Sequence, residues 1–121
     1  MQSTYDRIQY YKIEEKQKKV IIDKLKDLIS HEKDVKIAWL FGSLTRGDSV
    51  RDLDIAIHAE PEKSFKDYLD LNAQIELELG YPVDMVEIAK VPASLQQRIY
   101  REGILIKGTK ALQEQLEKKT V

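Results

Sequence analysis

The sequence predicts one α/β (α+β) domain in which a mixed sheet of about four strands is flanked by helices. Two observations lead to this fold class. Short apolar segments of strand length alternate along the chain with longer segments whose apolar residues recur at helical spacing. The chain has 121 residues, enough for one hydrophobic core, and shows neither an internal repeat nor a linker.

The first segment, residues 3–31, is predicted to form one long helix, or two helices with a weak joint. Its second half has an amphipathic pattern, whereas the aromatic and apolar residues of its first half form no clean stripe. We therefore divide the chain into residues 1–32, an N-terminal helix, and residues 33–121, the rest of the domain. The helix either packs loosely on the domain or docks a partner chain. The amphipathic positions are Val20, Ile21, Leu25, Leu28 and Ile29.

The first three strands, and the helix between the second and third, follow from apolar runs and from the residues that end them. Residues 35–41 and 52–58 are predicted strands, and Pro61 opens a helix that ends at Gly80. Residues 82–88 form the third strand. The buried face of the helix between them is expected to comprise Phe65, Tyr68, Leu69, Leu71, Ile75 and Leu79.

The C-terminal part continues the alternation of helix and strand. Pro92 begins a short helix that ends at Gly103, and residues 104–107 can add a fourth strand. Residues 110–119 form a last helix with Leu112 and Leu116 inward.

Composition excludes several classes of function. The chain has no cysteine, which excludes disulfides, thiolate metal sites and a cysteine nucleophile. A net charge of −1 argues against direct nucleic-acid binding, because such domains usually carry a basic excess. No apolar run approaches the ~20 residues of a membrane helix, and the N-terminus has no apolar signal core. We expect a cytoplasmic protein that does not bind membranes.

Three aspartates are the candidate metal ligands. Asp52 and Asp54 lie one residue apart in a predicted strand, so their side chains should share a face, with apolar residues on the other. Carboxylates grouped in this way suit Mg²⁺ or Mn²⁺. Asp84 lies in the next strand, and strand alternation leaves open whether it faces the pair. A solvated strand entry would explain Asp52 equally well but Asp54 poorly. An EF-hand is excluded, because Ile57 stands where its loop needs glycine.

A Gly-Ser turn is the candidate phosphate site. Gly42 ends an apolar strand and permits close approach of a ligand to the backbone. Ser43 adds a hydroxyl, and Arg46 adds a planar cation suited to phosphate oxygens. Gly-Ser alone is weak evidence, since most such pairs are turns. The chain contains neither a Walker loop nor a dinucleotide-binding glycine motif.

Together these residues resemble the nucleotidyltransferase superfamily of DNA polymerase β, and within it the minimal nucleotidyltransferase (MNT) domains of the MntA-like antitoxin type. The resemblance covers roughly residues 35–107, and residues 33–121 would be the MNT domain. It rests on the Gly42-Ser43 turn with L-T-R-G after it, the D-L-D strand at 52–54, V-D-M-V at 83–86, and P-A-S-L-Q-Q-R-I-Y-R-E-G at 92–103.

The resemblance implies a reaction and a set of roles. Gly42, Ser43 and Arg46 would hold the triphosphate of a nucleoside triphosphate, with ATP as the expected substrate. Two Mg²⁺ ions (or Mn²⁺) would be bound by the three aspartates, and Asp84 would help to deprotonate an acceptor hydroxyl. AMP would be transferred to that hydroxyl, and pyrophosphate would leave.

The resemblance also implies a partner. Domains of this kind are often encoded beside a helical HEPN-domain protein, and as antitoxins they can transfer AMP to its tyrosine. We therefore expect protein adenylylation within a toxin–antitoxin pair. Tyr5, Ile8 and Tyr11 would be docking contacts, and assembly with a second copy of the chain is a further option.

Two alternatives to this function stay open. Only eight residues separate Ser43 from Asp52, a short loop for these domains, and Leu44 stands where a basic residue is common. The domain could then be a catalytically weak or inactive module that neutralises a partner by contact. The other alternative is nucleotide transfer to a small molecule such as an antibiotic.

Overall fold

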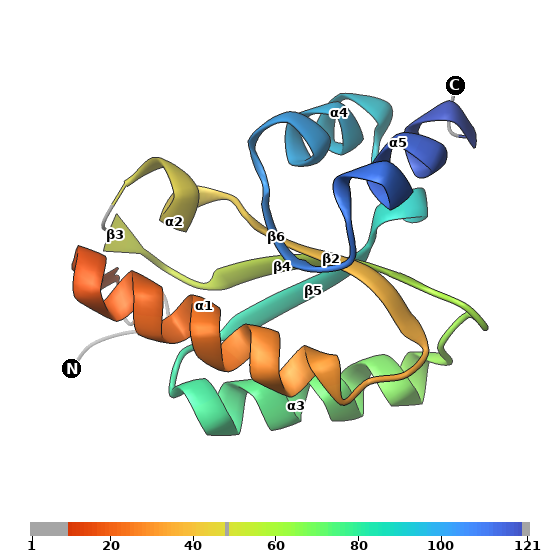
Figure 1. The fold of residues 1–121 in the computed structure, drawn as a ribbon. Coiled ribbons are helices and arrows are strands. Elements are labelled where there is room, and N and C mark those ends of the chain that lie inside the picture. Colours follow the sequence, from red (N-terminus) through yellow and green to blue (C-terminus); the bar gives the residue numbers. More distant parts are fainter. Residues whose placement is uncertain (1–9, 48, 120–121) are drawn as a thin grey trace, which may run out of the picture.

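A four-stranded mixed sheet with strand order β5-β4-β2-β6 forms the centre of the structure (Figure 1). The strands are β2 (Val35–Phe41), β4 (Leu53–Ala59), β5 (Val83–Glu87) and β6 (Ile104–Lys107). β4 runs parallel to β5, and β2 is antiparallel to both β4 and β6. This is a computed structural model that describes residues 10–47 and 49–119. The predicted fold class is confirmed.

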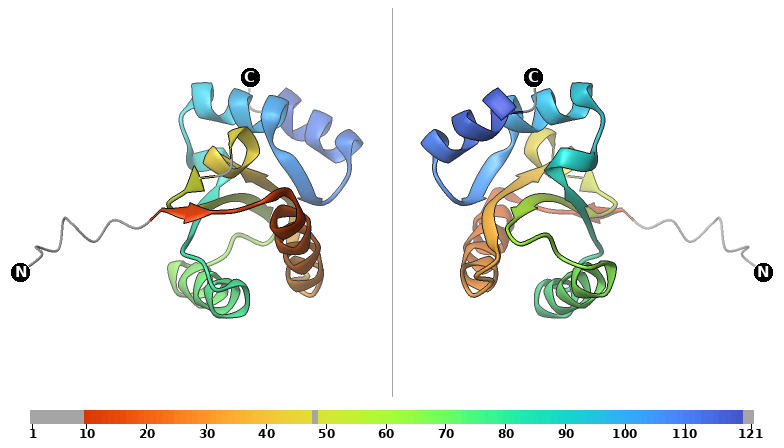
Figure 2. Two further views of the ribbon diagram at one scale, coloured as in Figure 1. Left: turned by 90° about the vertical axis from the view of Figure 1, so that its left-hand side faces the viewer. Right: turned by 90° about the vertical axis from the view of Figure 1, so that its right-hand side faces the viewer.

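Helices cover both faces of the sheet, as the two views of Figure 2 show. α1 (Glu15–Ser30) and α3 (Phe65–Leu79) lie on one face, and α4 (Ala93–Glu102) and α5 (Lys110–Lys119) lie on the other. The packing of buried residues follows this division: one apolar cluster joins the sheet to α1 and α3, and a second joins it to α4 and α5.

Side chains alternate along β4, so the residues on its two faces belong to different apolar clusters. Leu53, Ile55 and Ile57 are fully buried in the cluster beneath α1 and α3, as predicted. Ala56 faces the other way and packs with Trp39. Residues that share the face of Ala56, including Asp54, therefore point toward the side of the sheet that carries α4 and α5.

A buried hydrogen-bond network fixes the second cluster. The indole nitrogen of Trp39 donates to Oε1 of Gln113 at 2.9 Å, and the amide nitrogen of Gln113 donates to the Tyr100 carbonyl at 2.9 Å. Both side chains are almost fully buried, so each polar group needs such a partner. These hydrogen bonds connect α5 to Trp39, two residues before the end of β2.

The N-terminal helix is shorter than predicted. Residues 10–14 are not helical, and Tyr11–Lys12 forms strand β1. The helix begins only at Glu15, where Glu14 forms a capping box with Gln17. Ile13 is fully buried, and Ile21, Leu25 and Ile29 enter the main core, so α1 is packed tightly on the domain.

The helix after β4 also begins later than predicted. It starts at Phe65 because the Ser64 hydroxyl accepts a hydrogen bond from the Asp67 amide at 3.2 Å and so caps it. It ends at Gly80 as predicted, with φ +79. Its buried stripe is narrower than expected: Leu71 and Ile75 are buried, whereas Phe65 and Leu69 are exposed.

Among the described residues, four short elements, one of which is β1, were not predicted. α2 (Ser43–Arg46) follows β2, and β3 (Ser49–Val50) pairs with β1 in a separate two-stranded sheet. The 3-10 helix η2 (Ile88–Lys90) follows β5. Short elements of this kind have no periodicity to reveal them. Within the described parts of the chain, no helix is both long enough and apolar enough to span a membrane.

Candidate functional site

Two of the predicted acidic residues meet across the parallel pair of strands. In the register of β4 with β5, Asp54 lies directly opposite Asp84. Residues paired in this way project from the same face of the sheet. Asp84 therefore faces Asp54, which settles the point that strand alternation left open. Asp54 is half-buried and Asp84 is exposed.

Asp52 completes the group from just before β4. It lies close enough to Asp54 for a hydrogen bond between the two carboxyl groups. The pKa of Asp54 is raised from its ordinary 3.8 to about 7, mainly by burial and then by the charge of Asp52, that hydrogen bond and the charge of Asp84. The nearby Arg51 guanidinium lowers this pKa. Asp54 is thus a carboxyl group that neutral pH only partly ionises without a further cation.

Gly42 approaches Asp54 so closely that no side chain fits at this position. It has φ +82, and an ideal Cβ built there would lie 2.1 Å from Oδ2 of Asp54. The backbone of Gly42 faces Asp54 because Phe41, the last residue of β2, pairs with it. Glycine is therefore required here both by the left-handed backbone and by the contact with the carboxylate.

The turn after Gly42 is held by one threonine. The backbone N–H of Thr45 donates to the Gly42 carbonyl at 3.2 Å, and its hydroxyl donates to the same oxygen at 2.8 Å. Ser43 and Arg46 are the first and last residues of α2, so their backbone lies beside this turn as predicted. Their side chains are outside what the structure describes.

A small second sheet supports the loop that leads to Asp52. In this sheet Tyr11 pairs with Val50 and Lys12 with Ser49. The Tyr11 ring also packs edge-on against Tyr81, with centroids 5.3 Å apart. Tyr81 precedes β5 by two residues, so the N-terminal strand contacts the segments leading to both Asp52 and Asp84. Of the predicted docking contacts, Tyr5 and Ile8 lie outside the described residues.

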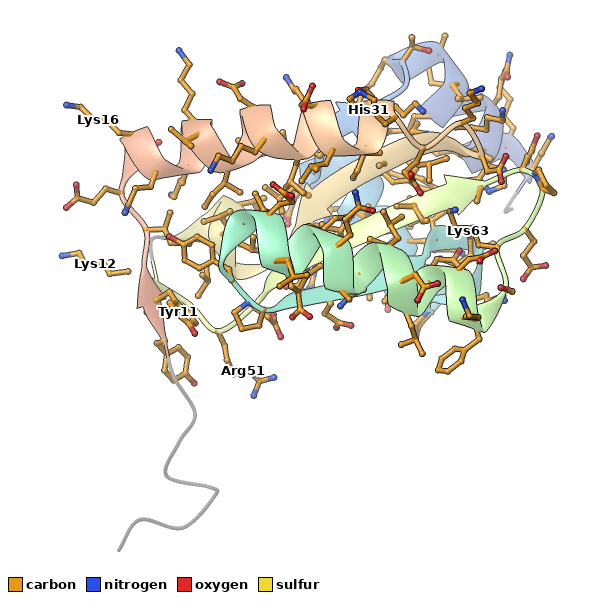
Figure 3. All side chains as sticks on the ribbon, turned by 90° about the horizontal axis from the view of Figure 1, so that it is seen from below. Tyr11, Lys12, Lys16, His31, Arg51 and Lys63 are labelled. Atoms are coloured by element: carbon orange, nitrogen blue, oxygen red, sulfur yellow. The ribbon has the colours of Figure 1, made fainter. Side chains whose placement is uncertain are left out.

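Two residues of the site were missed from the sequence. Arg51 affects the pKa of Asp54, and Thr45 holds the Gly42 turn. The sequence signal for Arg51 was its position directly before the D-L-D segment, where a basic side chain can lie close to the carboxylates. Figure 3 shows Arg51 and Tyr11 at the same end of the molecule, opposite Lys63.

The donor set fits a hard divalent cation shared with a ligand. Within residues 10–47 and 49–119, no three acidic or histidine side chains are arranged to hold a metal ion by themselves. Mg²⁺, however, is usually bound by one or two carboxylates together with phosphate oxygens of a substrate. Asp52 and Asp54 supply such a pair, and their mutual repulsion is the kind that a cation relieves.

The family of the chain follows from its sequence. The family model described as "Polymerase beta, Nucleotidyltransferase" matches residues 23–111. The chain belongs to this nucleotidyltransferase family. The match spans the Gly42 turn and all three aspartates, and it confirms the resemblance inferred from the motifs.

One sequence relative and two solved structures are similar to this nucleotidyltransferase. It is 37% identical over 72 residues to "Putative protein adenylyltransferase MJ1379" of Methanocaldococcus jannaschii, covering 56% of this chain and 72% of that protein. A chain of a toxin–antitoxin crystal structure with AMP-PNP has a TM-score of 0.71 at 25% identity, covering 82% of both chains. A complex of tri-AMPylated Shewanella oneidensis HEPN toxin with MNT antitoxin contains a chain with a TM-score of 0.69 at 23% identity, covering 84% of this chain and 82% of that one.

The contact between Gly42 and Asp54 gives a first prediction. Gly42→Ala should destabilise this nucleotidyltransferase more than Gly80→Ala, because both glycines have positive φ but a Cβ at Gly80 meets nothing within 4 Å. Backbone strain costs about 1–2 kcal/mol in either variant, and the overlap with Asp54 adds roughly 1–3 kcal/mol. Urea unfolding measures both. An equal loss of unfolding free energy in the two variants would contradict the close contact between Gly42 and Asp54.

The raised pKa of Asp54 gives a second prediction. The unfolded chain releases this proton near pH 3.8 and the folded chain near 7, so the folded state binds the extra proton between these values. The stability that Asp54 contributes is therefore present below pH 3.8 and is lost as pH rises through 7. The side chain of Asp54→Asn cannot ionise. The free energy of unfolding of this variant, minus that of wild type, should therefore increase from pH 4 to pH 8 in metal-free urea titrations. A difference between the two proteins that stays constant with pH would refute this prediction.

Proposed function

We propose that this protein transfers AMP from ATP, with Mg²⁺ bound, to a hydroxyl group on a partner protein. One observation supports the proposal above the others: Asp54 and Asp84 share one face across β4 and β5, with Asp52 beside them. The carboxylates adjoin a glycine turn at the end of β2 that leaves no room for a side chain.

The phosphates of ATP would rest at the turn after β2. Gly42 keeps the space next to Asp54 free of side-chain atoms, so an anionic ligand can approach the backbone closely. We assign Ser43 and Arg46 to phosphate binding, because their backbone positions in α2 adjoin this turn. Arg51 adds a positive charge on the Asp52 side of the group.

The three aspartates would hold up to two Mg²⁺ ions. When bound, the metal would offset negative charge on the phosphoryl oxygens during transfer. Asp52 and Asp54 would be metal ligands together, and Asp84 would complete the set. Asp84 is the exposed member, so it is the one placed to accept the proton of an incoming hydroxyl.

The names of the relatives support a protein as the acceptor. One is named as a protein adenylyltransferase, and another structural neighbour comes from a complex of an AMPylated HEPN toxin with its MNT antitoxin. We therefore propose that the partner of this chain is a HEPN-domain toxin and that the chain is its antitoxin. Tyr10, which is 66% exposed next to β1, extends the N-terminal surface proposed for docking.

The direct test of this function is nucleotide-dependent stabilisation. Mg²⁺ and ATP together should raise the melting temperature by several degrees, because a saturated site adds a few kcal/mol to the stability of a domain of this size. The rise should be lost in Asp54→Ala, and Glu114→Ala, an exposed carboxylate on α5, is the matched control that should keep it. The measurement is thermal unfolding with each ligand alone and with both.

The outcomes separate the enzyme from its main alternative. A rise that needs both ligands and Asp54 supports the nucleotidyltransferase. If wild type shows no rise with Mg²⁺ and ATP, the proposed function is wrong, and a module that acts by contact alone becomes the better explanation.

A further inference from the structure

Asp52 is the one aspartate of the site that the four-stranded sheet does not contain. Asp54 and Asp84 lie opposite one another within β4 and β5, whereas β4 begins at Leu53, one residue after Asp52. The charges of Asp52 and Asp84 nevertheless both act on Asp54. Because like charges repel, the position of Asp52 depends on what holds the segment before β4.

The segment before Asp52 is held by the N-terminal strand. In the small sheet of β1 and β3, Tyr11 is the partner of Val50, which lies two residues before Asp52. Val50 and Ile13, the residue after β1, are both almost completely buried in the main core. A slip of this pairing by one residue would turn buried side chains outward, so core packing fixes the register. The course of the chain toward Asp52 is therefore set by β1.

The ring of Tyr11 contacts a second segment, the one that leads to Asp84. It packs edge-on against Tyr81 with an angle of 83° between the ring planes, a favourable arrangement for two aromatic rings. Tyr81 lies three residues before Asp84. Tyr11 is only partly buried, at the end of the molecule where Figure 3 also shows Arg51. One of the residues predicted to dock a partner is thus also engaged within the domain.

A backbone hydrogen bond joins the same two segments. The N–H of Leu53 donates to the carbonyl of Pro82 at 2.9 Å. Leu53 directly follows Asp52, and Pro82 directly follows Tyr81. Tyr11 therefore lies across the point where the two strands that carry the aspartates begin. A movement of either segment at this point would change the distance between the carboxylates of Asp52 and Asp84.

We propose that Tyr11 is a positioning residue of the metal site, which holds the segment of Asp52 beside the strand of Asp84 through its pairing with Val50 and its ring contact with Tyr81. The inference rests on the proposed function and adds a residue to the same site. In this role Tyr11 touches neither the nucleotide nor the cation and acts through Asp52. Residues that orient metal ligands in this way commonly change metal affinity by about 10- to 100-fold when they are mutated.

A purely structural role for Tyr11 makes a different prediction. A side chain that only fills space in the core would lower the free energy of unfolding when it is removed and leave the affinity of the folded protein for a cation unchanged. A positioning residue lowers that affinity in protein that is still folded. Metal binding below the melting temperature therefore separates the two roles.

The test measures the dissociation constant of Mn²⁺ in the presence of a saturating, non-reactive ATP analogue with a methylene group between the α- and β-phosphorus atoms. Electron paramagnetic resonance of the free ion gives this constant for folded protein. Tyr11→Ala should raise it roughly tenfold. Tyr11→Phe should keep the wild-type value, because it retains both the ring and the backbone pairing.

Two further variants make the result specific to this contact. Leu28→Ala is the matched control, because Leu28 is also partly buried against the main core but lies near the other end of α1. It should lower stability without changing the Mn²⁺ constant. Tyr81→Ala removes the same ring contact from the other side, and it serves if Tyr11→Ala does not fold. Tyr81→Ala should weaken Mn²⁺ binding about as much as Tyr11→Ala, and the double variant should be no weaker than either.

Hydrogen exchange gives a readout that does not depend on metal. The Leu53 amide, which is bonded to Pro82, should exchange faster in Tyr11→Ala than in Leu28→Ala once the rates are compared at equal global stability. Equal rates in these two variants would mean that Tyr11 does not hold the two segments together.

The outcomes distinguish this inference from the proposed function. If wild type binds no Mn²⁺ with the analogue present, the proposed function is wrong and the role of Tyr11 falls with it. If wild type binds Mn²⁺ and Tyr11→Ala and Tyr81→Ala bind it equally well, the function stands and the positioning role is wrong. A loss of affinity in Leu28→Ala as large as in Tyr11→Ala would also overturn the positioning role, since it would reflect general destabilisation.

Discussion

The mutual repulsion of three carboxylates is the constraint on which the site depends. Asp52, Asp54 and Asp84 are brought together by the turn before β4 and by the register of β4 with β5. Burial raises the pKa of Asp54, and the charges of Asp52 and Asp84 add to this, so that the pKa lies at about 7. The fold therefore brings like charges together, an unfavourable interaction that a bound cation would relieve.

The rest of the domain holds this cluster in place. β4 is buried on both sides of the sheet along most of its length, so its register cannot slip without exposing Leu53, Ile55 and Ile57. On the opposite face, the bond from Trp39 to Gln113 anchors β2 to α5. Gly42 then ends β2 directly against Asp54. The position of the carboxylates is thus determined by core packing.

Most of the fold could be predicted from the sequence because long periodic segments specify their own structure. For the strands at 35–41 and 104–107 and for the helix at 110–119, the predicted ranges are the same as those in the structure. Residues 10–14 were assigned to a helix because their extended state depends on pairing with β3, which is distant in sequence. Likewise, Phe65 and Leu69 have the spacing of buried residues. Their exposure follows from α3 lying over the edge of the sheet, which periodicity does not encode.

The candidate site was predicted in part for the same reason. The D-L-D segment indicates that Asp52 and Asp54 lie together, because residues so close in sequence stay close in any fold, even though Asp52 lies just before β4. That Asp84 faces Asp54 depends on which strands pair and in which register, so the sequence could not decide it. Arg51 and Thr45 act through local turn geometry that leaves little signal in composition.

The central claim is that the carboxylate cluster and a nucleotide share one divalent cation site. The most direct measurement is anomalous diffraction from crystals of the protein grown with Mn²⁺ and an ATP analogue that has a methylene group between the α- and β-phosphorus atoms. The account predicts a manganese peak in contact with oxygens of Asp52, Asp54 and the analogue, with the phosphates at Gly42. Manganese bound elsewhere, or an analogue bound without contact to these aspartates, would contradict it.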